Sequence, residues 1–332
     1  MLPNFLIVGS AKCGTTSLYA WLKTHPEVFL PEFKEPGFFV RDTGFDDWGK
    51  YQSLFAAGEG KKAVGEATTD YLFSPESPDW IRRVLGDDVR ILILIRNPVE
   101  RAFSLYKYML MEGFENVVPF EKALALEERR FADEAFRALN REMFWAYMYV
   151  RTSFYCESIE RYMSVFDRRM VKILVFDDIV TDPHSVFAEV CEFLEISGSF
   201  RPRFSWENKS ATPRSVALQR FLRRNMYRGG ALPPLGALWR ASVARLMAAN
   251  KSSRKEIRLQ PATRQKLGGI FAGDVDRLGR LLDRDLSHWL RRERDDLSRK
   301  SSAAYRGRPS GGGPALERVP VSLETREGSG LK

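Results

Sequence analysis

The first residues of the chain with the types and spacing to bind an anion lie in a glycine-bounded loop near its start. An apolar run precedes this loop and a helical pattern follows it, the arrangement that aims backbone N–H groups and a helix dipole at a phosphate. The residues expected to surround the anion are consecutive: Ala11, Lys12, Cys13, Gly14, Thr15, Thr16 and Ser17.

The position of its lysine separates this loop from the nucleotide loop that it partly matches. Gly9 and Gly14 have the spacing of a Walker A motif, but Thr15 and Thr16 stand where that motif has Lys-Ser/Thr. Lys12 lies inside the loop instead, where it would act as a point charge against the anion.

A second anion site is predicted after the most apolar run of the sequence. The run 90–95 indicates a buried strand, and Arg96 follows at its carboxyl end, where open α/β sheets bind ligands. Ser104 lies about two turns into the next helix, which can bring its hydroxyl back toward Arg96. Two such sites suggest a nucleotide phosphorylated at its 5′ and 3′ sides. A salt bridge for Arg96 and a surface position for Ser104 are the alternative.

An aspartate pair supports a competing interpretation. Asp177 and Asp178 follow the apolar run 171–176, as do carboxylates that hold Mg²⁺ in NTPases. A nucleotide kinase or NTPase therefore stays an alternative, although a strand end with a helix cap explains the same residues. The histidines are scattered and the three cysteines lie far apart, so neither a metal site nor a disulfide framework is predicted.

Strands that alternate with helices must position these residues. The apolar runs that indicate strands lie at 5–8, 28–30, 63–67, 90–95 and 171–176. Long helices are predicted over 119–140, 142–166 and 274–290. The alternation predicts a three-layer, P-loop-like α/β fold with a mainly parallel central sheet flanked by helices.

Length and composition bound the organisation of the chain. Its 332 residues, 44% of them hydrophobic, suffice for one large domain, predicted over 1–298. Residues 299–332 are rich in Gly, Ser, Pro and charge and are predicted to be a disordered tail. A strand that begins by Phe5 leaves no room for a secretory signal, and no apolar run approaches the roughly 18 residues of a membrane span. We therefore expect a cytoplasmic protein.

Positive charge is concentrated in one segment. The net charge is +9, and residues 214–260 hold eleven lysines and arginines against one acid, Glu256. Two short amphipathic helices are predicted within this basic segment, which suggests an anionic partner. From Arg214 to Arg258 it could be a lid over a cofactor, a surface for an acidic acceptor or a membrane, or a solvated face. Few aromatic residues accompany the charges, which argues against nucleic acid.

In their order and spacing, these motifs resemble a known family. The stretch PNFLIVGSAKCGTTSLYAWLKTHPEV, residues 3–28, resembles the 5′-phosphosulfate-binding loop of PAPS-dependent sulfotransferases. The stretch LILIRNPVERAFSLY, residues 92–106, is similar to their 3′-phosphate motif. The similarity extends to about Leu194 and is strongest to the heparan-sulfate and other carbohydrate sulfotransferases, including bacterial relatives.

The resemblance implies roles for individual residues. PAPS would donate a sulfuryl group to a hydroxyl by in-line transfer, PAP would be the product, and no metal would be needed. Lys12 would stabilise the leaving phosphate, and Glu35 would deprotonate the acceptor hydroxyl as general base. Arg96 and Ser104 would hold the 3′-phosphate.

The late part of the resemblance concerns the rim of the cofactor site. Lys209 and Arg214 lie in a stretch similar to the family's late cofactor-binding loop, so the resemblance implies that one of them covers the cofactor. A peripheral membrane contact through the basic segment would accompany a cytoplasmic location.

On the acceptor side, the chain departs from the heparan-sulfate enzymes. Gly37 stands where those enzymes usually have a histidine or another polar residue, and Ala67 follows Glu66 where they have a lysine. The resemblance therefore implies an acceptor hydroxyl on a carbohydrate, glycolipid or natural product, without specifying heparan sulfate. A protein that binds an anionic glycan or lipid without catalysis is the non-enzymatic alternative.

Overall fold

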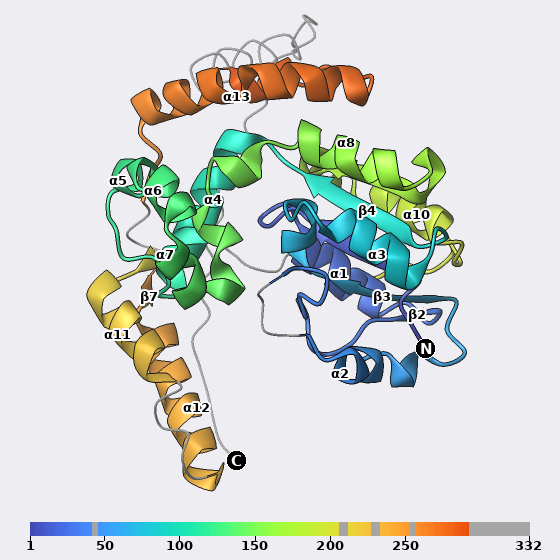
Figure 1. Cartoon of the computed structure of the whole chain (residues 1–332), viewed down its shortest axis with the longest axis horizontal. Helices are drawn as coiled ribbons and strands as arrows, with labels where there is room; N and C mark the ends of the chain where they lie inside the picture. The colour runs from blue at the N-terminus through green and yellow to red at the C-terminus, as the bar shows by residue number, and fades with distance from the viewer. Residues whose placement is uncertain (42–45, 206–211, 227–232, 253–256, 292–332) are drawn as a thin grey trace, which may run out of the picture. The chain divides into compact units, whose positions relative to one another are not determined.

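A five-stranded parallel sheet forms the centre of the fold. The computed structural model describes residues 1–41, 46–205, 212–226, 233–252 and 257–291, with the backbone alone at 233–238 and 252. The central strand, β1 (Phe5–Gly9), pairs in parallel with β3 (Ala63–Ala67) and β4 (Arg90–Ile95). With β2 (Val28–Phe29) and β5 (Val171–Val175), the order is β2-β3-β1-β4-β5 (Figure 1). The prediction of a mainly parallel α/β sheet is confirmed.

Alternate side chains of the strands build one core on each face of this sheet. Leu6 and Val8 of β1 belong to one core, whereas Phe5 and Ile7 belong to the other. The first core is covered by α3 (Ser77–Leu85), α4 (Pro98–Met111), α8 (Cys156–Val165) and α13 (Pro261–Leu281). The second is covered by α1 (Thr15–Lys23) and α10 (Pro183–Phe193). Because both faces are buried, the strands are continuous apolar runs without alternation.

The two long helices predicted over 119–140 and 142–166 are wrong. The chain forms α5 (Phe120–Ala125), α6 (Glu127–Ala132) and α7 (Glu134–Leu139), then the short turns η3 (Arg141–Met143), η4 (Trp145–Tyr147) and η5 (Arg151–Ser153) before α8. The Glu127 carboxylate accepts the N–H groups of Val150 and Arg151, each at 2.8 Å. The Tyr149 carbonyl accepts from buried Arg101 at 3.1 Å. These tertiary partners replace the hydrogen bonds that would continue a helix.

The helix predicted over 274–290 has different bounds. It begins earlier, at Pro261, and α13 ends at Leu281, with the separate turn η7 (Ser287–Leu290) following. Asp274 lies in the middle of α13 and accepts the N–H groups of Tyr155 and Cys156 at 2.9 and 3.2 Å. Asp274 therefore joins α13 to the start of α8.

The remaining elements complete the described part of the chain. They are α2 (Trp48–Ser53), α9 (Phe176–Thr181), α11 (Val216–Met226), α12 (Pro233–Ala249), the antiparallel pair β6 (Thr212–Pro213) and β7 (Lys251–Ser252), and the turns η1 (Ala56–Gly58), η2 (Thr69–Leu72) and η6 (Arg168–Met170). No helix within these residues is both long and apolar enough to cross a membrane. One compact unit ends at Leu290, and the predicted tail, 299–332, lies outside the described residues.

Candidate functional site

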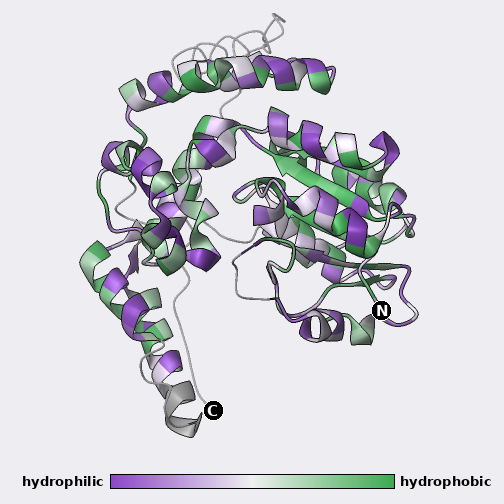
Figure 2. Cartoon of the chain, in the orientation of Figure 1, coloured by the Kyte–Doolittle hydropathy of each residue, from purple (hydrophilic) through white to green (hydrophobic). Residues whose placement is uncertain are grey.

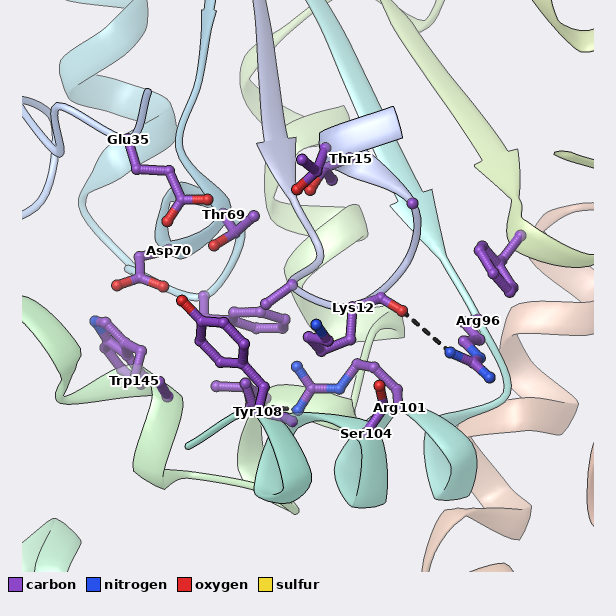
Figure 3. Close-up of a pocket in the computed structure, with 18 of the residues that line it drawn as sticks. Lys12, Thr15, Glu35, Thr69, Asp70, Arg96, Arg101, Ser104, Tyr108 and Trp145 are labelled. Atoms are coloured by element: carbon purple, nitrogen blue, oxygen red, sulfur yellow. Dashed lines mark hydrogen bonds between the residues drawn. The ribbon is translucent and has the colours of Figure 1, made fainter. Parts of the chain in front are cut away.

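A cavity of about 350 Å³ opens at the carboxyl ends of the central strands (Figure 3). It lies beside β1, where the strand order reverses, the place at which open parallel sheets bind ligands. Of the residues proposed from the sequence, those that line it are Ala11, Lys12, Gly14, Thr15, Thr16, Ser17, Glu35, Arg96 and Ser104.

Among the proposed residues that the structure describes, two are not part of this lining. Cys13 is fully buried, and its Sγ lies 3.9 Å from the Tyr155 hydroxyl. Arg214 is exposed beside β6, and its backbone N–H donates to the Asn250 carbonyl at 2.6 Å. Lys209 lies outside the described residues. The suggested cover of the cofactor by Lys209 or Arg214 stays a prediction.

The loop after β1 presents the start of α1 to the cavity. Gly14 precedes the helix with a φ of 93°, a conformation that favours glycine. A Cβ atom on Gly14 would also meet the Phe176 ring at 3.2 Å. The local glycine therefore lets the chain turn tightly, so that the first N–H groups of α1 can serve an anion.

Lys12 is held in a setting that disfavours its own charge. Its backbone has a φ of 69°, which is uncommon for a residue with a side chain, and its Nζ lies 4.6 Å from the centre of the Tyr108 ring. Burial, followed by the neighbouring cations Arg96 and Lys34, lowers the pKa of Lys12 to about 8. An anion bound at this point would relieve the repulsion and restore the charged form.

Arg96 and Ser104 also line the cavity, and they follow β4 in the chain. The Arg96 guanidinium lies 4.6 Å from the centre of the Phe176 ring and donates to the Lys12 carbonyl at 3.4 Å. Ser104 lies on α4, and Arg101 and Tyr108 share its face through spacings of three and four residues. We call Lys12, Arg96, Ser104 and the start of α1 the basic half of the cavity.

Arg101 is a fully buried cation that the sequence analysis did not identify. Its guanidinium donates to Ser10 Oγ at 3.3 Å, to Ser153 Oγ at 2.9 Å and to the Tyr149 carbonyl. Arg101 thereby ties the loop after β1 to the turns that precede α8.

The loop that carries Glu35 is fastened to the end of β3. The Glu35 N–H donates to the Ala67 carbonyl at 3.0 Å, and the Gly37 N–H donates to Thr68 Oγ1 at 3.3 Å. The Thr68 hydroxyl in turn donates to the buried Glu66 carboxylate at 2.9 Å. Glu35 has a φ of 62°, so Glu35 and Lys12 are two of the four non-glycine residues with positive φ in the described chain. Such conformations gather at functional sites.

Two further residues lie with Glu35 on the side of the cavity away from Arg96 (Figure 3). Asp70 follows β3, and burial together with the charge of Glu35 raises its pKa to about 7. Trp145 comes from η4, inside the stretch that the sequence analysis assigned to a helix. We call Glu35, Asp70 and Trp145 the acidic half. Lys34 pairs with the Glu35 carboxylate at 2.7 Å.

The aspartates proposed for magnesium have other partners. Asp178 forms a bidentate ion pair with Arg284, in which one of the two hydrogen bonds is 2.7 Å long. Asp177 accepts a hydrogen bond from the Trp289 indole at 2.7 Å. Neither aspartate lines the cavity. Their contacts join α9 to the segment that follows α13.

Comparisons with known proteins identify the family of the chain. The family model for the sulfotransferase domain matches residues 2–222. A solved sulfotransferase from Alicyclobacillus acidocaldarius is 30% identical, with a TM-score of 0.66 over 88% of this chain and all of that one.

Curated relatives add two further similarities. The mouse heparan sulfate glucosamine 3-O-sulfotransferase 5 is 28% identical over 62% of this chain. The membrane-associated sulfotransferase kil1 of Dictyostelium discoideum is 22% identical over 61% of it. The chain spans only 56% and 59% of the lengths of these two relatives.

Proposed function

The chain belongs to the family of PAPS-dependent sulfotransferases, and from this we propose that it transfers the sulfuryl group of PAPS to a hydroxyl of a carbohydrate, glycolipid or natural product. The assignment as a sulfotransferase replaces the kinase and non-catalytic alternatives. One observation carries the proposal: Lys12, Arg96, Ser104 and Glu35, from three separate parts of the chain, line a single cavity.

The basic half suits a donor with phosphates at two positions. The start of α1 and Lys12 would take the 5′-phosphosulfate, because backbone N–H groups and a partly desolvated cation favour an oxyanion. Arg96 and Ser104 would take the 3′-phosphate. We assign PAP, which keeps both phosphates, as the product that remains bound there.

The acidic half suits the acceptor. Glu35 would accept the proton of the acceptor hydroxyl as its oxygen forms a bond to sulfur. The bond between sulfur and the 5′-phosphate oxygen breaks in the same step, and Lys12 would stabilise the negative charge that develops on that oxygen. Positioning and charge stabilisation supply most of the catalysis in such transfers, as in phosphoryl transfer.

The side chains of the acidic half support a sugar-like acceptor. Trp145 presents an aromatic surface and Asp70 a hydrogen-bond acceptor, a combination suited to a neutral polyhydroxylated ring. Curated relatives include enzymes named for heparan sulfate, which supports a sugar acceptor. Two carboxylates in this half would repel an acceptor that is already heavily sulfated.

We propose a cytoplasmic location for the reaction.

Calorimetric binding and a transfer assay test the proposal together. Titration with PAP in the presence of a chelator should show binding that Arg96→Ala weakens, whereas Mg²⁺-ATP should bind more weakly than PAP. Incubation with labelled PAPS and cell-extract acceptors should give a product heavier by one sulfate.

Two results would contradict the proposal. One is a preference for Mg²⁺-ATP over PAP, which would argue against the donor. The other is transfer that persists in Glu35→Gln at the rate of the unchanged protein, which would argue against the base.

A further inference from the structure

We propose that the hairpin of α11 and α12 is a membrane-docking device that inserts an apolar face into the surface of an anionic lipid bilayer. The two helices run antiparallel. Asn250, after α12, hydrogen-bonds Ser215, before α11, with Nδ2 at 2.8 Å from the Ser215 carbonyl. At the other end, the Trp239 indole donates to the Asn225 carbonyl at 2.9 Å. Leu222, Val243 and Met247 form a small core between the helices.

One face of this hairpin is bound to the rest of the domain. Gln219 Nε2 donates to the Met111 carbonyl at 2.6 Å, and the Arg223 guanidinium lies 4.1 Å from the centre of the Phe114 ring. Lys251 pairs with Glu112 at 3.5 Å. The hairpin also packs so closely that a Cβ atom on Gly113 would meet the Gln219 carbonyl oxygen at 2.7 Å.

A different face is apolar and exposed. Leu218, Phe221 and Asn225 follow one another on α11 at spacings of three and four residues, so they form a row along one face of the helix. On α12, the row Trp239, Ser242 and Leu246 has the same spacing, and the indole contact to Asn225 brings the two rows together. We define the outer face as Leu218, Phe221, Trp239, Ser242 and Leu246. Its four large apolar side chains are exposed, with 63% of Phe221 accessible.

The two helices that carry the outer face also carry exposed positive charge. Arg220, Arg224, Arg240 and Arg245 are all exposed. Within the described residues, the ion pairs of the hairpin and the adjoining β7 are those of Arg223 and Lys251 with Glu112, on the bound face. Figure 2 shows strongly hydrophilic and apolar residues interspersed along α11.

The combination of these two features identifies a lipid surface as the occupant. Arginines and aromatic rings could suit an acidic glycan, but a glycan gives no reason to expose the aliphatic side chains of Leu218 and Leu246. A helix lying in a bilayer interface buries aromatic and aliphatic side chains below the headgroups while its cations meet anionic lipids. The exposed apolar side chains are unfavourable in water and become favourable when such a surface buries them.

Vesicle sedimentation tests the inference on the full chain. Vesicles of phosphatidylcholine with phosphatidylserine should bind the protein, and pure phosphatidylcholine vesicles should bind it more weakly. Leu218→Ser/Phe221→Ser should lower the partition coefficient about tenfold. The matched control, Leu139→Ser/Val180→Ser, removes exposed apolar side chains elsewhere and should change it little, since Leu139 is 85% exposed on α7.

The arginines are tested by a second pair of variants. Arg220→Gln/Arg224→Gln should weaken binding to the anionic vesicles about thirtyfold, because each arginine near such a surface contributes about 1 kcal/mol. Arg83→Gln/Arg129→Gln, two exposed arginines on other helices, should have a smaller effect.

A fluorescent label reports insertion directly. The native cysteines Cys13, Cys156 and Cys191 are buried, so a maleimide dye should react with a cysteine placed on the surface. A dye on Ser242→Cys should shift to the blue with anionic vesicles, and a dye on Ser164→Cys, on exposed α8 surface, should not.

Three results would overturn the inference. They are binding to heparin without binding to vesicles, equal losses in the variants and their controls, and a Ser242→Cys dye that stays in water.

Discussion

The basic and acidic halves of the cavity are built in different ways. The basic half takes most of its groups from one local unit, β1 with the following loop and the start of α1. It adds Arg96 and Ser104 from β4 and α4, and β4 is paired with β1 in the sheet. The acidic half collects Glu35 from a loop, Asp70 from the end of β3 and Trp145 from η4. A donor site built from local units can be common to many enzymes, whereas an acceptor site assembled from distant segments can change independently.

Glu35→Gln tests the acidic half most severely. It should lower kcat by about 10²- to 10⁴-fold, because glutamine cannot accept the hydroxyl proton, while the Kd for PAP stays within a factor of about two. Single-turnover transfer and calorimetry measure the two quantities. Glu32→Gln is the matched control, an exposed acid of the same loop that pairs with Lys23 at 2.6 Å. Equal losses in both variants would contradict a specific role for Glu35.

Lys12→Ala tests the basic half at the reacting bond. It should lower kcat about 10²- to 10³-fold, because the charge on the leaving phosphate loses its stabilising cation. Lys50→Ala, at an exposed position on α2, is the control.

The pH profile gives Lys12 a second test. A lysine with its pKa lowered to about 8 is charged below that pH and neutral above it, so kcat/KM should fall as the pH rises through about 8. In Lys12→Arg this alkaline limb should disappear, because arginine stays charged. An unchanged limb in Lys12→Arg would assign it to another group.

Arg96→Ala tests whether the two halves bind separate ligands. The variant should raise the Kd for PAP about tenfold to a hundredfold, which is the usual loss when a hydrogen bond to a charged group is removed. Its effect on the acceptor KM should be smaller. Arg90→Ala is the control, since Arg90 lies at the opposite end of the same strand and pairs with Glu195. A larger change in acceptor KM than in PAP affinity would contradict the division.

Asp70→Asn should have the smallest effect and a sign opposite to that of most substitutions. A carboxyl whose folded-state pKa is raised to about 7 binds more protons folded than unfolded, so stability falls as the pH rises from about 4 to 7. The variant should therefore be more stable than the unchanged protein at pH 8, by about 1 kcal/mol, and its acceptor KM should rise.

Urea unfolding at pH 8 and pH 5 measures this difference, which should be present at the higher pH and small at the lower one. Asp88→Asn, at an exposed position, should show no such pH-dependent gain. A loss of stability in Asp70→Asn at pH 8 would contradict the account.

Local patterns predicted the donor side because its groups are close in sequence. Three local features could be recognised without knowing which distant segments lie together. They are the apolar run before Gly9, the displaced Lys12 and the spacing from Arg96 to Ser104. The same reading failed over 119–166, where periodicity favoured two helices. There, the side chains of Glu127 and Arg101 form hydrogen bonds with backbone groups of residues 149–151. The pattern of apolar residues along the sequence does not indicate such partners.

The sequence by itself predicted the parallel α/β sheet, which the structure confirms, and the loop after β1, because hydrophobic periodicity and glycine spacing act over short distances. The proposed donor came from the resemblance of the motifs to those of PAPS-dependent sulfotransferases. Only the tertiary structure placed Asp70 and Trp145 beside Glu35 and turned the apolar rows of α11 and α12 to one face. Those arrangements depend on hydrogen bonds and packing between residues far apart in the chain, such as the bonds that join the Glu35 loop to β3.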